Sequence, residues 1–382
     1  MSYSKILCFG FDRPMHLNRM LSSLEANNLA QDSEVIICID GPTASTDKKL
    51  HKETVNVAEK NRNFKSKKLI IRNENLNCRT NIINTISELF ETNDKLIILE
   101  DDLILSKYFL TYMNDALNIY QDKKDMWCIN GYTYRQLNFK HRSSVSKYIS
   151  PWGWATWSDR WKIFVERDYD KNNFISELPK EKRDIFNVNG LYDWENIIVK
   201  NEQGLISAWD AYWYQAVFLN NGLTLYPNKS HVNNEGFDGT GMHCSDTNDW
   251  KTPINTVRTK HFPNKIKISK YFMFNTLNFY RYYQFTRYLR YHKNKISSLE
   301  KAAIHKYKEL EPNANIKRSR RLYEEGNISE LPWAKYMQEE LKAQPDDIER
   351  PGDYLTESEQ PKKKNTYIVK DGNRQIRETK SD

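Results

Sequence analysis

Three consecutive acids follow a short apolar segment. Glu100, Asp101 and Asp102 come directly after residues 95–99, whose leucines and isoleucines suit a buried strand. Adjacent carboxylates at the end of such a strand are costly unless they meet a cation. A hard divalent ion is the natural partner, because such ions commonly join a protein carboxylate to substrate phosphates. The sequence therefore predicts metal-assisted departure of a diphosphate, against the alternative of solvated acids near the start of a helix.

Polar residues also follow other apolar runs. Asp40 ends the run 34–39, where its carboxylate could accept from the imide of uracil or from a ribose hydroxyl; the alternative is a turn formed with the next glycine. Arg13 precedes a proline that suits the first turn of a helix. Its planar guanidinium suits phosphate groups, and Arg79 stands similarly at the start of a later helix. A surface ion pair is the alternative for both arginines.

Two further candidates lie in a stretch rich in Trp and Tyr, between residues 132 and 241. Asp210 stands in Ala-Trp-Asp-Ala-Tyr-Trp. A carboxylate flanked by aromatics, with its pKa raised by desolvation, would serve as a general base, although the residue also suits a helix cap. Trp154, in Trp-Gly-Trp, could stack on a donor or acceptor sugar. The alternative for Trp154 is packing in the core.

The elements that must position these residues follow from the periodicity of the chain. Apolar runs alternate with segments of helical spacing over the first 131 residues, which predicts a mostly parallel α/β sheet. Ligands of such sheets bind beyond the carboxyl ends of the strands, which is where the acids and Arg13 stand. The expected strands are residues 5–11, 34–39, 67–72, 95–99, 126–130 and 223–226, the last preceded by a helix over 210–221.

Composition limits the class of protein. The 382 residues carry a formal net charge of +8, which suits an anionic partner. The mean hydropathy is −0.80, and no apolar run is long enough to span a bilayer. Five scattered cysteines without a Cys-x-x-Cys pair argue against disulfides and zinc, so we expect a reducing, cytoplasmic location. Nucleic acid is not expected, because the basic residues gather near the C-terminus rather than among stacking aromatics.

At these motifs the chain resembles N-acetylglucosaminyltransferase I and related bacterial glycosyltransferases. The similarity covers roughly residues 4–245 as ordered motifs. The matching stretches are Phe11-Asp-Arg13, Cys38-Ile-Asp40-Gly, Ile97-Ile-Leu-Glu-Asp-Asp-Leu103, Tyr108-Phe109, Met126-Trp-Cys-Ile129, Trp152-Gly-Trp154 and Trp209-Asp210.

The resemblance implies a GT-A, Rossmann-like fold and a role for each matched position. Asp102 would bind Mn²⁺ (or Mg²⁺), while Glu100 and Asp101 would contact the donor sugar and ribose. Asp40 would recognise uridine, and Asp210 would be the catalytic base of an inverting reaction. The expected function is transfer of a sugar from a UDP-sugar to a hydroxyl of a glycan or glycolipid, in surface polysaccharide or glycoconjugate synthesis.

The chain departs from the family at two positions. Ala211 replaces the second acid of Trp-Asp-Asp-Trp, and Ser230-His231 replaces a Ser-Arg pair. Donor specificity therefore does not transfer, and N-acetylglucosamine is one option among several sugars. Two other functions stay open: a carbohydrate-binding protein without catalysis, and a sugar-nucleotide pyrophosphorylase, although the latter needs a glycine-rich phosphate loop that residues 10–14 do not form.

We expect four segments along the chain. Residues 1–131 would bind the nucleotide sugar, and residues 132–262 would form the acceptor-binding and catalytic half of the same domain. Residues 263–343 would be a helical extension, and residues 344–382 a disordered tail. The first helix of the extension, 268–295, mixes Tyr and Phe with Lys and Arg. It could lie on the anionic inner face of a membrane, or pack on the catalytic domain with its cations reaching water.

Overall fold

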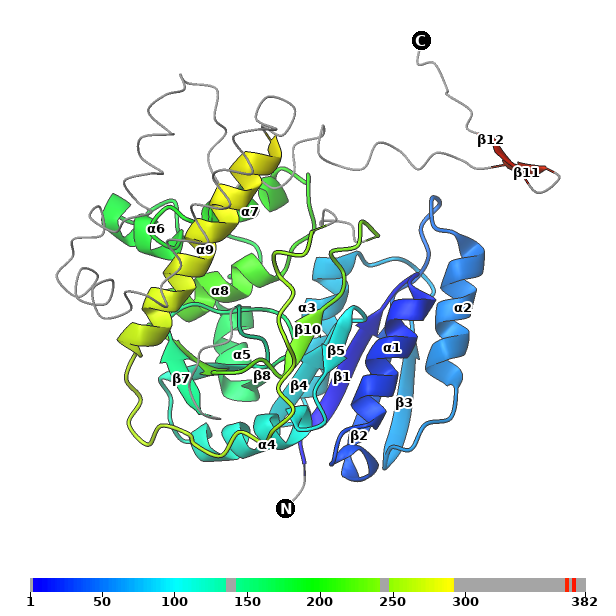
Figure 1. Cartoon of the computed structure of the whole chain (residues 1–382), viewed down its shortest axis with the longest axis horizontal. Coiled ribbons are helices and arrows are strands. Elements are labelled where there is room, and N and C mark those ends of the chain that lie inside the picture. The colour runs from blue at the N-terminus through cyan, green and yellow to red at the C-terminus, as the bar shows by residue number, and fades with distance from the viewer. Residues whose placement is uncertain (1–2, 135–141, 241–246, 292–367, 371–372, 376–382) are drawn as a thin grey trace, which may run out of the picture.

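A central eight-stranded sheet with helices on its faces organises the molecule (Figure 1). The computed structural model describes residues 3–134, 142–240, 247–291, 368–370 and 373–375. The strand order is β3-β2-β1-β4-β8-β6-β9-β7. The predicted fold class is confirmed: the sheet is mixed but mostly parallel, and it is consistent with a GT-A-like Rossmann fold.

The N-terminal half of the sheet follows the sequence pattern closely. Four parallel strands alternate with helices, and β1, β2 and β4 are almost wholly buried because Ile, Leu and Val occupy both faces. The elements are β1 (Lys5–Gly10), α1 (Pro14–Glu25), β2 (Glu34–Ile39), α2 (Lys48–Glu59), β3 (Ser66–Ile71), α3 (Cys78–Phe90) and β4 (Lys95–Leu99), with a short 3-10 turn at Ala30–Asp32.

The second half of the sheet contains antiparallel strands. Strand β8 (Trp154–Trp157) lies between β4 and β6 (Met126–Asn130) and is antiparallel to both. Because β8 runs against β4, the residues just before it lie at the carboxyl end of β4. Strand β9 (Leu223–Pro227) is parallel to β6, and β7 (Ser143–Ser146) is the antiparallel edge strand.

The remaining elements surround this frame. A small sheet pairs β5 (Leu103–Leu105) with β10 (Val232–Asn234), just beyond the end of β4. The other helices are α4 (Phe109–Tyr120), α5 (Ser158–Glu166), α6 (Lys180–Phe186), α7 (Trp194–Glu202) and α8 (Asp210–Leu219). A short antiparallel pair, β11 (Ile368–Lys370) and β12 (Asn373–Gln375), lies within the segment predicted to be a disordered tail.

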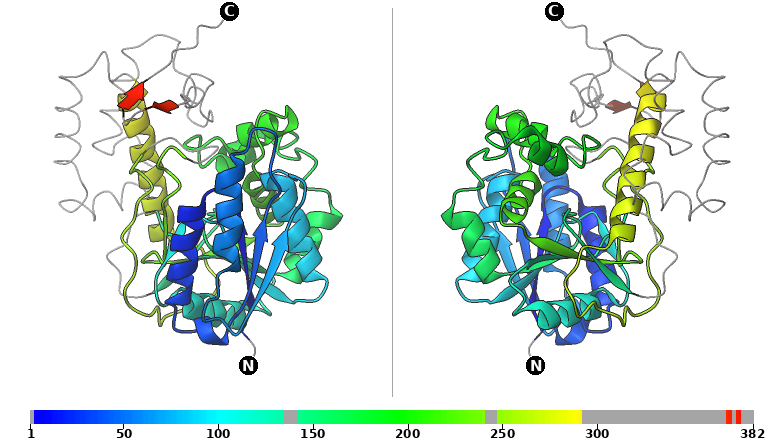
Figure 2. Two further views of the ribbon diagram at one scale, coloured as in Figure 1. Left: turned by 90° about the vertical axis from the view of Figure 1, so that its right-hand side faces the viewer. Right: turned by 90° about the vertical axis from the view of Figure 1, so that its left-hand side faces the viewer.

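The long C-terminal helix α9 (Lys270–Tyr291) stands along one flank of the molecule in both views of Figure 2. It packs on the α/β domain: the Tyr280 hydroxyl donates to that of Tyr134 at 3.0 Å, and the Phe279 ring lies 5.1 Å from that of Trp250. In the part of the chain that the structure describes, no helix is long and apolar enough to cross a membrane. From residue 292 onward, the helical extension predicted over 263–343 lies outside the described residues.

Candidate active site

The ends of β1 and β4 bring one arginine and two acids into contact. Arg13 occupies the N-cap position of α1 and reaches across to the turn after β4. Its Nη2 donates to Asp102 Oδ2 at 3.1 Å and also to Asp101 Oδ1, while its Nε donates to Asp101 Oδ2 at 3.3 Å. A planar fork that contacts both carboxylates is the geometry in which Arg is strongest. Of the two acids, Asp101 is buried and Asp102 is half-buried.

Burial and mutual repulsion shift the protonation of this cluster. Burial lowers the pKa of Arg13, but the charges of Asp101 and Asp102 outweigh it, so that pKa is raised above its usual value. Burial raises the pKa of Asp101, and Arg13 opposes that rise. The pKa of Glu100 is raised well above its ordinary value, first by burial and then by the charges of Asp102 and Asp210. The site thus concentrates negative charge, which a cation would relieve.

Asp210 begins helix α8 and faces the same cluster. Burial raises its pKa to about 6, which is the direction expected for a general base. Its Oδ1 accepts from the backbone N–H of Ala211 at 3.0 Å. The N-cap position itself belongs to Trp209, and no side chain caps the helix there. Asp210 therefore does not cap α8, although it lies in the first turn of that helix.

Cys78, at the start of α3, lies among the carboxylates and was not singled out from the sequence. Its pKa is raised well above the ordinary value, first by burial and then by the charges of Glu100, Asp210, Asp101 and Asp40. These acids follow β2 and β4 or begin α8, so the thiol feels the charge of carboxylates from three separate parts of the chain. No spacing rule could have identified it, because the convergence arises only in the folded chain.

The carboxylate of Asp40 organises the loop that follows β3. Its Oδ1 accepts from the N–H groups of Gly41 and Leu76 at 2.9 and 3.0 Å, and its Oδ2 accepts from Asn75 Nδ2 at 3.1 Å. Burial raises the pKa of Asp40, and these backbone donors oppose the rise. Gly41 is required here, because an added Cβ would lie 2.3 Å from the backbone carbon of Glu74.

Arg79 lies in the first turn of α3 and faces α8. Its guanidinium carbon is 5.2 Å from the centre of the Tyr212 ring, a cation–π contact. Its backbone N–H donates to Ser207 Oγ at 3.1 Å, and that hydroxyl donates to Asn77 Oδ1 at 2.7 Å. These contacts tie the chain just before Asp210 to the start of α3.

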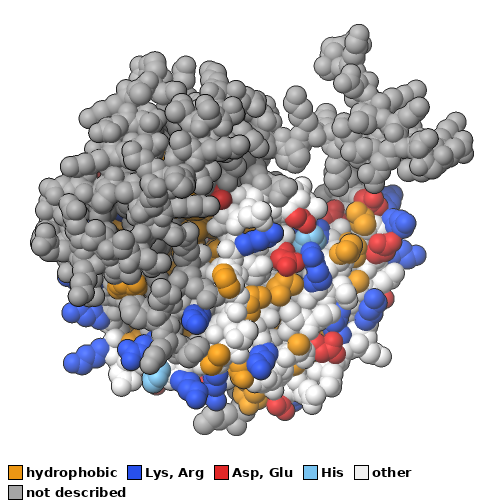
Figure 3. All heavy atoms as spheres, in the orientation of Figure 1, with side chains coloured by type: hydrophobic (Ala, Val, Ile, Leu, Met, Phe, Trp, Pro, Cys, Tyr) orange, Lys and Arg blue, Asp and Glu red, His pale blue; other side chains and the backbone are white. Residues whose placement is uncertain are grey.

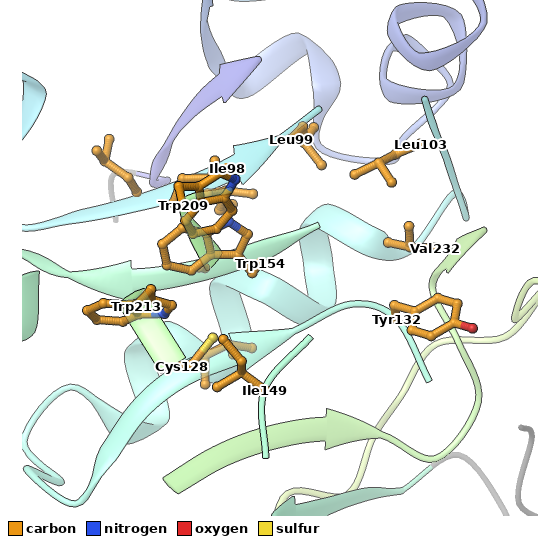
Figure 4. Close-up of a cluster of buried hydrophobic side chains, with 14 of the residues drawn as sticks. Ile98, Leu99, Leu103, Cys128, Tyr132, Ile149, Trp154, Trp209, Trp213 and Val232 are labelled. Carbon is orange, nitrogen blue, oxygen red and sulfur yellow. The ribbon is translucent and has the colours of Figure 1, made fainter. Parts of the chain in front are cut away.

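Trp154 is part of the core, which corrects the expectation that it stacks on a sugar. Only 1% of its surface is exposed, so no ring face is open to a ligand. Its indole stacks on Trp209 at 5.1 Å and also lies close to Trp213 (Figure 4). The ring of Trp161 lies 6.1 Å from it. The half-buried tryptophan of the motif is Trp152.

A loop from the second half of the chain lies beside Asp102, and its role was not predicted from the sequence. The N–H of Glu235 donates to the Asp102 carbonyl at 2.8 Å, and its side chain lies 3.0 Å from Arg19 of α1. His16 of the same helix lies 3.1 Å from a carboxylate oxygen of Asp238. This loop therefore joins α1 to the turn after β4.

The donor atoms around Asp102 fit a divalent ion only in part. Among the described residues, no group of three His, Cys, Asp or Glu side chains is arranged to hold a metal. Gly236 keeps the space beside Asp102 open, since a Cβ there would lie 2.2 Å from Asp102 Oδ2. Hard oxygen donors of this kind suit Mn²⁺ and Mg²⁺, which often use one or two carboxylates and take their other ligands from substrate phosphates and water.

Comparison with known proteins gives distant likenesses only. No protein-family model and no curated protein matches the chain. Similar solved structures include the mannosyltransferase PcManGT from Pyrobaculum calidifontis in complex with GDP-Man and Mn²⁺ (10% identity, TM-score 0.31, covering 43% of this chain and 46% of that one). Others are S. aureus TarS (12%, 0.34, 63% and 37%) and a cytidylyltransferase from Leptospira borgpetersenii serovar Hardjo-bovis strain JB197 (12%, 0.28, 44% and 65%). Each match spans less than two thirds of the other protein, and none is close enough to assign an activity.

Proposed function

We propose that the chain is a glycosyltransferase that moves a sugar from a UDP-sugar to a hydroxyl of a glycan or glycolipid, with inversion. One observation carries the proposal: a half-buried carboxylate with a raised pKa, Asp210, lies near Glu100, which directly precedes the arginine-bound acids Asp101 and Asp102 at the carboxyl edge of a mostly parallel sheet. Group transfer from a diphosphate needs both parts: acids that can hold a divalent cation for the leaving group, and a base for the acceptor.

The leaving group would bind where α1 begins. Arg13 offers a charged fork there, and the free N–H groups at the start of a helix favour anions. Asp101 would orient Arg13, and Asp102 would hold Mn²⁺ or Mg²⁺ together with the diphosphate oxygens. The metal, when bound, would supply positive charge to the departing diphosphate. Glu100, between these acids and Asp210, would contact the donor sugar.

Asp210 would take the proton from the acceptor hydroxyl. With a pKa of about 6, it is mostly ionised near neutral pH, yet basic enough to accept a proton. The repulsion between Asp210 and Glu100 makes the ionised pair costly, and proton uptake by Asp210 would relieve it. Attack by the deprotonating hydroxyl on the face of the sugar opposite the diphosphate gives inversion.

Recognition of uridine is proposed for the loop built on Asp40. Its Oδ2 accepts from one side-chain donor, Asn75, and a carboxylate oxygen has capacity for another donor such as a uracil imide or ribose hydroxyl. Arg79, beside α8, would add positive charge near the phosphates.

We place the reaction in the cytoplasm, at the inner face of the membrane, with a lipid-linked or free glycan as acceptor.

The test is hydrolysis of a panel of nucleotide sugars by the purified full chain, with Mn²⁺ and with EDTA, reading released nucleoside diphosphate. We expect slow Mn²⁺-dependent release from one UDP-sugar, lost in Asp210→Asn and Arg13→Ala. Asp184→Asn is the matched control, because this acid of α6 has a 51% exposed side chain and forms an ion pair with Lys180 at 2.6 Å. If no sugar nucleotide is hydrolysed and calorimetry detects no UDP binding with Mn²⁺, a carbohydrate-binding protein becomes the better description.

A further inference from the structure

A basic segment outside the candidate site leads into α9, and we call residues 257–270 the basic strap. Five of its fourteen residues are Lys or Arg, and none is acidic. All five basic side chains are exposed, and so is His261. The strap runs along the lower left of Figure 1, and the same region of Figure 3 gathers Lys and Arg side chains. The five basic residues are Arg258, Lys260, Lys265, Lys267 and Lys270.

The strap is held to the domain by its backbone and by inward side chains. The Tyr120 hydroxyl donates to the carbonyl of Pro263 at 2.8 Å, and the N–H of Ser269 donates to the Val145 carbonyl at 2.9 Å. Phe262 packs against the core from the same side. The lysines between these anchors therefore project from a fixed backbone, so little conformational entropy is lost when they meet a charged surface.

The positive charge of the strap is largely unbalanced. Arg258 forms an ion pair with Asp115 of α4 at 2.9 Å. The four lysines make no ion pair with any residue that the structure describes. An uncompensated cluster of this kind attracts anionic surfaces.

Two exposed aliphatic side chains accompany the lysines. Val257 is 41% exposed and Ile268 is 38% exposed, at opposite ends of the strap. Single-stranded nucleic acids are bound by basic grooves with exposed aromatic rings for base stacking, and no aromatic ring of the strap is among the large exposed apolar side chains of the described residues. Cations with flanking aliphatic groups suit lipid headgroups and the upper acyl region instead.

We propose that the basic strap is a docking surface for an anionic lipid bilayer. Binding would be electrostatic in the main, with Ile268 and Val257 entering the headgroup region. From sequence, the candidate membrane-facing segment was the helix over 268–295. In the structure the apolar side chains of α9 pack on the domain, and the exposed lysines lie in the strap before it. The proposal does not depend on the transferase activity, because vesicle binding requires no turnover.

The experiment is co-sedimentation of the full chain with vesicles of phosphatidylcholine alone or mixed with phosphatidylglycerol, at low and high salt. The test variant is Lys260→Gln/Lys265→Gln/Lys267→Gln. The control is Lys48→Gln/Lys49→Gln/Lys52→Gln, which removes the same charge from exposed positions of α2, on the other side of the molecule (Figure 1). Thermal melts of both variants check that the fold is intact.

We expect the wild type and the control to bind only the anionic vesicles and to dissociate at high salt. Each strap lysine removed should weaken partitioning by about fivefold, and the triple variant by on the order of 100-fold. Ile268→Ser should weaken binding to the anionic vesicles at low salt, because it removes an apolar contact with the headgroup region. The proposal is overturned if the wild type stays in the supernatant, if the strap variant binds like the control, or if a single-stranded RNA binds more tightly than the vesicles at equal salt.

Discussion

Replacing Asp210 by asparagine should slow the proposed transfer reaction and also stabilise the protein. The side chain keeps its size, and its Oδ1 can still accept from the N–H of Ala211. Only the ionisable group is lost. The pKa of Asp210 is raised from 3.8 to about 6 by burial, so the folded state disfavours its charged form.

The sign of the stability effect follows from that shift. Because the pKa of Asp210 is higher in the folded state than in the unfolded state, ionisation of this side chain destabilises the fold. The fold is therefore more stable when the carboxyl is protonated, and this stability is lost as pH rises from about 4 to about 6. A shift of about two units corresponds to at most about 3 kcal/mol. Part of the carboxylate meets solvent, so we expect Asp210→Asn to raise the free energy of unfolding by about 1–2 kcal/mol at pH 8.

The assay combines urea denaturation at pH 4 and pH 8 with rates between pH 5 and 9. We expect the gain in stability at pH 8 only, a loss in kcat of about 10²–10⁴-fold, and an acid limb near pH 6 in the wild type that the variant lacks. Asp184→Asn, on exposed α6, should change neither. Equal stability changes at pH 4 and pH 8 would refute the burial argument, and wild-type turnover by the variant would refute the base assignment.

Other substitutions test the rest of the site. Arg13→Lys should lower the free energy of unfolding by about 1.5–3 kcal/mol and raise the donor KM, because a lysine cannot fork between Asp101 and Asp102; urea melts and initial rates measure both. Asp102→Asn should weaken Mn²⁺-dependent UDP binding by roughly 10–100-fold in calorimetry, and unchanged affinity would remove its assignment as metal ligand. Gly236→Ala should act in the same direction, since its Cβ would displace the Asp102 carboxylate. Trp154→Ala should cost about 3–5 kcal/mol in urea melts without a selective change in substrate KM; a large KM change with an intact fold would return Trp154 to the binding site.

The N-terminal strands could be predicted because strands buried on both faces have continuous apolar sequences. Strands β2, β4 and β6 have the predicted bounds, β1 ends one residue earlier than predicted, and β3 is shifted by one residue toward the N-terminus. Helix α2 was not predicted because only four of its twelve residues are apolar, although its buried positions Thr54, Val57 and Ala58 do keep helical spacing. Strands β7 and β8 were missed because each has four residues, too few for a period to appear.

The site was predictable where it depends on strand ends and not where it depends on packing across the chain. Arg13 and Asp101 meet because parallel strands end at one edge, a rule that needs only the order of the elements. The convergence of acids on Cys78 depends on positions more than 100 residues apart, which no local pattern encodes. Trp154 was placed in the site because the motif Trp-Gly-Trp does not indicate whether a ring faces solvent or the core, so sugar stacking and core packing could not be told apart.

The insertion of β8 between β4 and β6 affects how the chain can fold during synthesis. Until residue 157 has emerged from the ribosome, the edge of β4 that later pairs with β8 presents unpaired N–H and C=O groups beside Leu96 and Ile98. Exposed apolar strand edges of this kind invite pairing with other chains. A fragment ending near residue 131 would carry every N-terminal strand and still leave that edge open. A nascent chain would therefore depend on chaperones until β8 is made, and truncation at the midpoint of the sheet should give aggregates rather than a nucleotide-binding domain.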